Sequence, residues 1–140
     1  MSRVFWDTNL FIYLLEDSGE RAQRVVSLRE RMLTRGDQLY TSALTLGEIL
    51  VKPAEAGNTA LMQEYEQTIG AGAVIVPFDQ PAARAYAVIR KDRSIRPPDA
   101  IQLACAVKSH IDLFITNDDR LGQKVIPGIQ FITSLDRAYL

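Results

Sequence analysis

Four acidic residues stand out by their positions relative to the predicted strands and helices. Asp7 directly follows a short apolar run, and Asp118 comes two positions after another. Glu48 lies in a helical segment that follows a strand, and Asp99 lies in the first turn of a helix that opens with two prolines. Ligands of open parallel sheets bind beyond the carboxyl ends of the strands. We therefore expect the four carboxylates to converge at that edge.

Bringing carboxylates together has an electrostatic cost. Two of them about 4 Å apart repel each other by roughly 4 kcal/mol at an effective dielectric constant near ~20. A hard divalent cation such as Mg²⁺ or Mn²⁺ supplies the countercharge and prefers oxygen ligands. Such a cation can bind a phosphate oxygen, lower the pKa of bound water and stabilise a leaving oxygen. The four acids therefore predict a metal site suited to the hydrolysis of phosphodiester bonds.

Short strands alternate with helices along the chain, in positions that can present these acids. The predicted strands are residues 3–6, 39–41, 73–76, 113–116 and 129–132. The predicted helices are residues 9–15, 20–35, 42–52, 58–69, 80–91, 98–109 and 118–123. The strands are apolar and rich in Val and Ile, which is typical of a parallel sheet covered on both faces. The sequence predicts a single α/β domain over residues 1–140.

Residues that break helices are expected to set several of these boundaries. The predicted helix ends are Asp17-Ser18-Gly19, Gly36, Pro53 and Gly70. Pro97-Pro98 is expected to open the sixth helix, since proline is tolerated in a first helical turn.

The overall composition excludes several classes of protein. Hydrophobic residues make up 47% of the 140 residues, so the chain can bury enough apolar surface to fold. The net charge of −1 argues against avid, non-specific binding to duplex nucleic acid, but it allows an enzyme that touches a few phosphates.

The single cysteine, Cys105, cannot form a disulfide within the chain or belong to a multi-cysteine zinc site, and we expect it in the core. The chain starts without the basic-then-apolar pattern of a signal peptide, and no apolar run approaches the roughly 20 residues of a membrane helix. We therefore expect a cytoplasmic protein with no membrane partner.

The segments around the four acids resemble the motifs of PIN-domain nucleases. These segments are Val4-Phe5-Trp6-Asp7-Thr8-Asn9, Thr45-Leu46-Gly47-Glu48-Ile49, Pro98-Asp99-Ala100-Ile101-Gln102-Leu103-Ala104 and Phe114-Ile115-Thr116-Asn117-Asp118-Asp119-Arg120-Leu121. Each motif is weakly specific alone, but the ordered set spans nearly the whole chain. Its order, spacing and length resemble the VapC toxins of bacterial and archaeal toxin–antitoxin pairs.

The resemblance implies a three-layer α/β/α fold with five parallel strands, and endoribonuclease activity that depends on Mg²⁺ or Mn²⁺. The residues that match the family's acidic positions are Asp7, Glu48, Asp99 and Asp118, and those that match its polar support are Thr8, Asn9, Thr116 and Asn117. The resemblance also implies a small antitoxin encoded beside the chain, and a homodimer.

The fourth acidic position is a choice among neighbours. Asn117, Asp118 and Asp119 are adjacent, and members of the family vary there. We assign Asp118 because two positions after Thr116 is the usual spacing.

Two arginines are candidate RNA contacts. Arg93 and Arg96 precede Asp99 closely enough to flank the predicted site. Contacts from arginine to phosphate position a nucleic acid without specifying its sequence.

Each acid also has a purely structural interpretation. Asp7 is a favoured residue for capping the first helix, and Asp118 or Asn117 has the same use at the last one. Thr45-x-x-Glu48 fits a capping box if its helix begins at Thr45, and Asp99 suits the helix dipole. Four independent caps in the order of the nuclease motifs would be a coincidence, so we favour the functional interpretation.

Two rival functions share this fold. One is a PIN-like module that binds RNA or protein without cutting, which the presence of all four acids disfavours. The other is a housekeeping RNA-processing nuclease, which the single-domain length and the lack of an added RNA-binding module disfavour.

Overall fold

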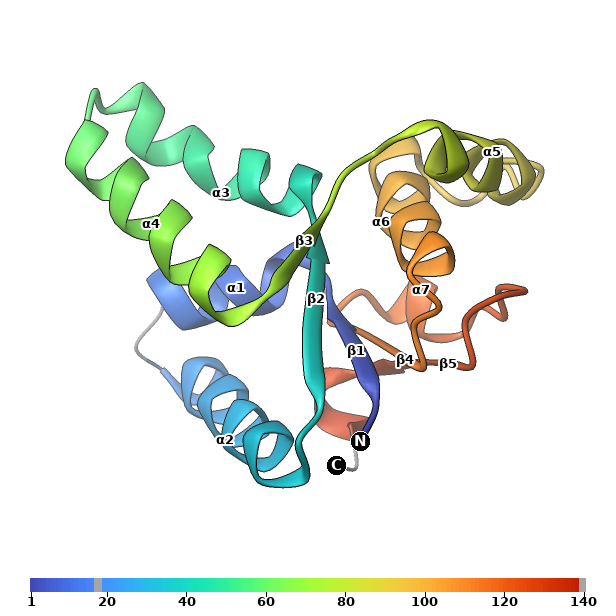
Figure 1. Cartoon of the computed structure of the whole chain (residues 1–140), viewed down its shortest axis with the longest axis horizontal. Helices are drawn as coiled ribbons and strands as arrows, with labels where there is room; N and C mark the ends of the chain where they lie inside the picture. Colours follow the sequence, from blue (N-terminus) through green and yellow to red (C-terminus); the bar gives the residue numbers. More distant parts are fainter. Residues whose placement is uncertain (17–18, 139–140) are drawn as a thin grey trace.

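A computed structural model describes residues 1–16 and 19–138, and within them five parallel strands form one sheet (Figure 1). The strands are β1 (Arg3–Trp6), β2 (Gln38–Ser42), β3 (Val74–Val76), β4 (Leu113–Thr116) and β5 (Phe131–Ser134). Their order across the sheet is β3-β2-β1-β4-β5. Because every pair is parallel, all carboxyl ends lie at one edge, with β1 at the centre.

Helices cover both faces of this sheet, which confirms the predicted three-layer α/β/α architecture. They are α1 (Thr8–Glu16), α2 (Glu20–Arg35), α3 (Ala43–Glu55), α4 (Thr59–Gly72), α5 (Gln80–Ile89), α6 (Pro97–Lys108) and α7 (Asp119–Gly122), followed by a 3-10 turn, Leu135–Arg137. In Figure 1, α1 to α4 lie on one side of the strands and α5 to α7 on the other. Across the described ranges, no helix is long and apolar enough to cross a membrane.

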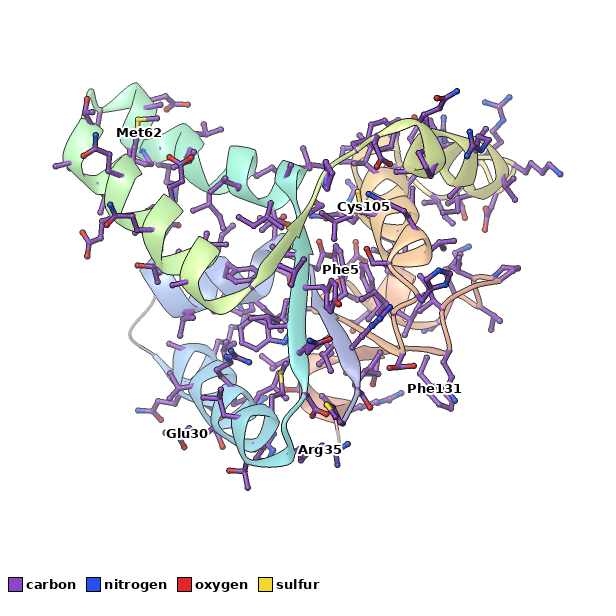
Figure 2. All side chains as sticks on the ribbon, viewed as in Figure 1. Phe5, Glu30, Arg35, Met62, Cys105 and Phe131 are labelled. Carbon is purple, nitrogen blue, oxygen red and sulfur yellow. The ribbon has the colours of Figure 1, made fainter. Side chains whose placement is uncertain are left out.

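The central strand divides the core into two clusters. Val4 and Trp6 pack with α1 and α2, whereas Phe5 points to the opposite face, because side chains alternate along a strand. The ring of Phe5, which is labelled in Figure 2, stacks on that of Phe114 in β4, with centroids 5.0 Å apart. Cys105 is fully buried in the same cluster, as predicted.

One predicted helix boundary is wrong because a single missing hydrogen bond does not end a helix. Pro53 lacks an N–H group, yet α3 continues through it to Glu55. The following turn still closes, since the N–H of Ala56 donates to the carbonyl of Lys52 at 3.1 Å.

A glycine marks a helix end only where the backbone there adopts a left-handed conformation. Gly36 ends α2 as predicted, with a left-handed φ of 77°. Gly70 was expected to end α4, but it lies inside that helix, which runs to Gly72. Of the break predicted after the first helix, Asp17 and Ser18 lie outside the described residues.

The fifth strand begins two residues later than predicted. Its ladder with β4 pairs Leu113 with Phe131 at one end and Thr116 with Ser134 at the other. Ile129, at the start of the predicted strand, is buried in the loop before it. Hydrophobicity therefore located the buried residue correctly but not the start of the strand.

Candidate active site

Asp7 lies at the carboxyl end of the central strand, where the chain leaves the sheet for α1. Its backbone N–H continues the ladder by donating to the carbonyl of Ile115 at 3.0 Å. Its carboxylate accepts hydrogen bonds from the Thr8 N–H at 2.9 Å and from the Thr116 hydroxyl at 2.8 Å. Only 7% of Asp7 is exposed. The strand and its neighbours therefore fix this carboxylate in one position.

The surroundings of Asp7 oppose its ionisation. Burial removes water from the carboxylate and raises its pKa to about 6, although the hydrogen bonds from Thr116 and Thr8 lower it. The negative charges of Asp99 and Glu48 raise this pKa further. Two acids from separate segments of the chain therefore act electrostatically on Asp7.

Glu48 is positioned by α1 and not by a helix cap. The N-cap of α3 is Ser42, whose hydroxyl accepts from the N–H of Thr45 at 3.2 Å, so the capping-box interpretation of Glu48 is wrong. Instead, the hydroxyl of Thr8 donates to Glu48 Oε1 at 2.7 Å. The residue next to Asp7 in the chain thus holds the second acid.

A buried glutamine that the sequence interpretation missed holds the threonine that makes this hydrogen bond. The amide nitrogen of Gln102 in α6 donates to the hydroxyls of Thr8 at 2.9 Å and Thr45 at 2.8 Å. Its amide oxygen accepts from the hydroxyl of Ser42. Each threonine hydroxyl has one proton, so Thr45 donates to Thr8, at 3.1 Å, and Thr8 donates to Glu48.

The three hydroxyls and both polar atoms of the Gln102 amide have partners, and Gln102 is only 2% exposed. One feature of the sequence could have indicated its importance: Gln102 is a long polar residue among the apolar residues of the third motif. Its importance depends on three distant segments meeting around it, which the sequence pattern does not show.

Asp99 and Asp118 are joined by an arginine. Arg96 Nε lies 3.4 Å from Asp99 Oδ2, and Arg96 Nη2 lies 3.7 Å from Asp118 Oδ2. Asp118 also caps α7, accepting from the backbone N–H of Arg120 at 3.0 Å, as its structural interpretation predicted. Burial tends to raise the pKa of Asp118, but the hydrogen bonds and charge of Arg120, with the charge of Arg96, hold it below its ordinary value.

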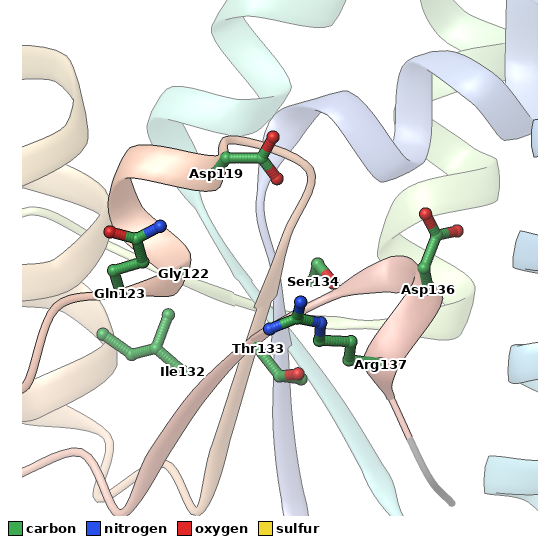
Figure 3. Close-up of a pocket in the computed structure, with 8 residues that line it drawn as sticks. All are labelled: Asp119, Gly122, Gln123, Ile132, Thr133, Ser134, Asp136 and Arg137. Atoms are coloured by element: carbon green, nitrogen blue, oxygen red, sulfur yellow. The ribbon is translucent and has the colours of Figure 1, made fainter.

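Thr116 connects the fourth acid to the first. Its hydroxyl donates to Asp7 and accepts from the backbone N–H of Asp118 at 3.0 Å. The other neighbour of that position, Asp119, turns toward a different pocket, between α7 and β5 (Figure 3). This arrangement favours Asp118 over Asp119 as the fourth acid.

The remaining predicted support residues hold the loop after β4 against α1. The backbone N–H of Asn117 donates to the side-chain oxygen of Asn9 at 3.3 Å, and the Asn117 amide donates to the Tyr13 hydroxyl at 2.8 Å. Arg93 is exposed between α5 and α6. Asn9 and Asn117 therefore act on the site through the backbone that carries Asp118.

The donor set fits a hard divalent cation, since the four acids present only oxygen atoms and Asp7 is costly to ionise beside other negative charges. Within residues 1–16 and 19–138, however, no three acidic, histidine or cysteine side chains lie close enough together to hold a metal ion as they stand. Binding would therefore require these carboxylates to move closer together.

Comparison of the sequence with known families decides the relationship. The family described as PIN domain matches residues 4–126, which include all four acids. The chain belongs to the PIN domain family. The resemblance that the four motifs predicted is therefore confirmed.

Solved structures share the fold of this PIN-domain protein. A chain of VapBC2 from Rickettsia felis, bound to a promoter DNA fragment, has a TM-score of 0.75 and 14% identity, covering 94% of this chain and 98% of that one. A chain of DNA-bound VapBC from Salmonella typhimurium has a TM-score of 0.73 and 21% identity, covering 96% of this chain and 99% of that one. A chain of a toxin–antitoxin complex from Klebsiella pneumoniae has a TM-score of 0.67 and 22% identity, covering 90% of this chain and 94% of that one. No curated protein matches the sequence.

Replacing Asp7 by Asn should change stability in a pH-dependent way. The pKa of Asp7 rises from 3.8 to about 6 on folding, so its contribution is favourable below pH 4 and is lost as pH rises through about 6. Above that range the ionised carboxylate costs at most roughly 3 kcal/mol. In metal-free urea titrations, Asp7→Asn should be more stable than the parent at pH 8, and this advantage should vanish at pH 4. Equal destabilisation at both pH values would contradict the assignment.

Replacing Gln102 by Leu should lower the free energy of unfolding by about 1–3 kcal/mol, because the hydroxyls of Ser42, Thr8 and Thr45 lose their partner. It should also weaken Mn²⁺ binding, since Thr8 no longer has to donate to Glu48. Urea unfolding and Mn²⁺ titration measure the two effects. The matched control is Gln67→Leu, on the exposed surface of α4, which should change stability by less than about 0.5 kcal/mol. Similar results for the two variants would rule out the network's role.

Proposed function

We propose that this PIN-domain protein is an endoribonuclease that depends on Mg²⁺ or Mn²⁺. The observation that carries the proposal is the buried carboxyl group of Asp7, which lies in the field of Asp99 and Glu48, while within residues 1–16 and 19–138 no cationic side chain offsets them by shifting its pKa. A site built in this way is stabilised by a divalent cation, and the cation in turn suits phosphodiester chemistry.

Each acid has a part in the proposal. Asp7, Glu48, Asp99 and Asp118 would hold one or two cations, directly or through water. When bound, the cation supplies a Lewis acid that neutralises phosphate charge and makes water more acidic. Thr8 and Thr116 hold the carboxylates of Glu48 and Asp7 by hydrogen bonds of 2.7 and 2.8 Å. Oriented carboxylates bind metal more tightly, because less freedom is lost on binding.

The proposed reaction adds one water molecule to the phosphorus and breaks its bond to the 3′-oxygen. The products are a 5′-phosphate and a 3′-hydroxyl. Arg96, and less directly Arg93, would bind phosphates of the substrate strand beside the acids. A substrate inside the cell suits the cytoplasmic location that the sequence predicts.

We further propose that the chain is the toxin of a toxin–antitoxin pair and that its protein partner is the cognate antitoxin. The support is the fold, shared over nearly the whole length with chains from VapBC and toxin–antitoxin complexes. A homodimer, usual in such a family, is part of the same proposal.

Asp7→Asn should lower the rate of RNA cleavage in Mg²⁺ by at least about 100-fold, because the fixed carboxylate at the centre of the site is lost. Asp119→Asn is the matched control, since Asp119 is the neighbour of Asp118 that faces another pocket. It should cut at close to the parental rate, whereas Asp118→Asn should not. Full cleavage by Asp7→Asn in gel assays of single-stranded RNA would overturn the nuclease assignment.

A non-catalytic role is distinguished by metal binding. A cation that binds only the folded state stabilises it by about 2.7 kcal/mol at one hundred times its dissociation constant. Mn²⁺ should therefore raise the Tm of the parent and leave that of Asp7→Asn nearly unchanged. A parent that shows neither a shift nor cleavage is a binding module.

The toxin assignment has its own test in cells. Induced expression of the chain in bacteria should stop growth, and Asp7→Asn should not, because arrest depends on cleavage. Co-expression of the product of the neighbouring gene should restore growth. Normal growth with an active, well-expressed parent would favour a housekeeping RNA-processing nuclease instead.

A further inference from the structure

A pocket of about 360 Å³ opens beside the acids of α6 and α7. Its lining combines two of the proposed metal ligands, Asp99 and Asp118, with two cationic side chains, Arg120 and Lys124. Arg96 reaches the same two acids from the start of α6. The pocket is therefore the place where proposed metal ligands and positive side chains meet.

Two arginines neutralise these acids in the metal-free protein. Arg96 contacts both Asp99 and Asp118, and Arg120 Nη2 lies 3.2 Å from the same Oδ2 atom of Asp118 that Arg96 approaches. The arginines are 60% and 66% exposed, whereas Asp99 and Asp118 are 19% and 21% exposed. The positive groups thus lie on the solvent side of the negative ones.

A divalent cation would compete with these arginines for the same oxygen atoms. Two carboxylates and two guanidinium groups are in balance, so an added cation leaves an excess of two positive charges. Exposed ion pairs are individually weak and their side chains are long, so both arginines can turn outward at little cost. An excess of positive charge at a pocket attracts a polyanion.

We propose that Arg96 and Arg120 exchange partners when a divalent cation binds. The two arginines release Asp99 and Asp118 and instead bind phosphate oxygens of the RNA strand in this pocket. The inference rests on the proposed function, because it takes the two acids as metal ligands. It adds that the pocket holds a phosphate next to the one that is cut. It follows that metal and RNA each favour the binding of the other.

Lys124 provides a matched control within the pocket. Its Nζ is 2.9 Å from Asp92 Oδ2 and 2.7 Å from Ser94 Oγ, and neither residue belongs to the proposed metal site. Lys124→Gln removes one positive charge, as each arginine variant does. It does not free an oxygen atom of Asp99 or Asp118.

The test uses two binding measurements on the full chain. Mn²⁺ affinity is measured by titration without RNA. RNA affinity is measured by the anisotropy of a fluorescent ten-nucleotide single strand, in Ca²⁺ and in EDTA, with a gel to verify that the strand stays intact. The parent should bind the RNA at least about fivefold more tightly in Ca²⁺ than in EDTA.

Arg96→Gln and Arg120→Gln should move the two affinities in opposite directions. Each should bind Mn²⁺ more tightly than the parent, because a competitor for the carboxylates is gone. Each should bind RNA in Ca²⁺ at least about fivefold more weakly, because a phosphate contact is gone. Lys124→Gln should leave Mn²⁺ affinity unchanged.

Unchanged or weaker Mn²⁺ binding by both arginine variants overturns the exchange, as does unchanged RNA binding in Ca²⁺. Failure of the proposed function looks different, because the parent itself would then bind no Mn²⁺ and cut no RNA. The exchange alone is disproved if the parent binds Mn²⁺ and cuts RNA but the arginine variants have the same Mn²⁺ and RNA affinities as Lys124→Gln.

Discussion

The carboxyl group of Asp7 is the constraint on which the rest of the site depends. The central strand ends next to Asp7, whose side chain is buried yet lies at the edge of the sheet at which ligands bind. Because burial disfavours charge, the carboxyl group of Asp7 resists ionisation and its pKa is raised to about 6. The hydrogen bonds of Thr8 and Thr116 fix it in position without removing that cost. A bound cation would offset that cost.

The buried polar network beside Glu48 serves the same site. Glu48 is exposed on α3, and ordering an exposed glutamate costs side-chain entropy. Its anchor is buried, since the amide of Gln102 donates to the hydroxyl of Thr8, which donates to Glu48. Partly satisfied networks of this kind destabilise a core, whereas complete ones specify its geometry. The packing of α1, α3 and α6 against one another therefore also sets the orientation of an acid.

The sequence predicted those features of the fold that depend on local hydrophobic pattern and on the order of elements along the chain. The strand that ends at Trp6, the helix that ends at Gly36 and the parallel sheet all follow from hydrophobic runs and breakers. The family motifs added the choice of acids. The hydrophobic pattern failed to predict features that depend on contacts with distant segments. One is the start of β5 at Phe131, where the ladder with β4 begins. Another is the role of Gln102, which exists only because three segments of the chain meet there.

The charge balance at α6 and α7 explains how a carboxylate-rich site can fold before it holds a cation. Asp7 stands at the sheet with a raised pKa, so it can relieve repulsion by taking up a proton. Asp118 cannot, because Arg96 and Arg120 keep its pKa low, and those arginines neutralise it instead. The site thus uses protonation at its buried end and guanidinium groups at its exposed end. Both are reversible, so both would yield the carboxylate oxygens to a cation of higher charge.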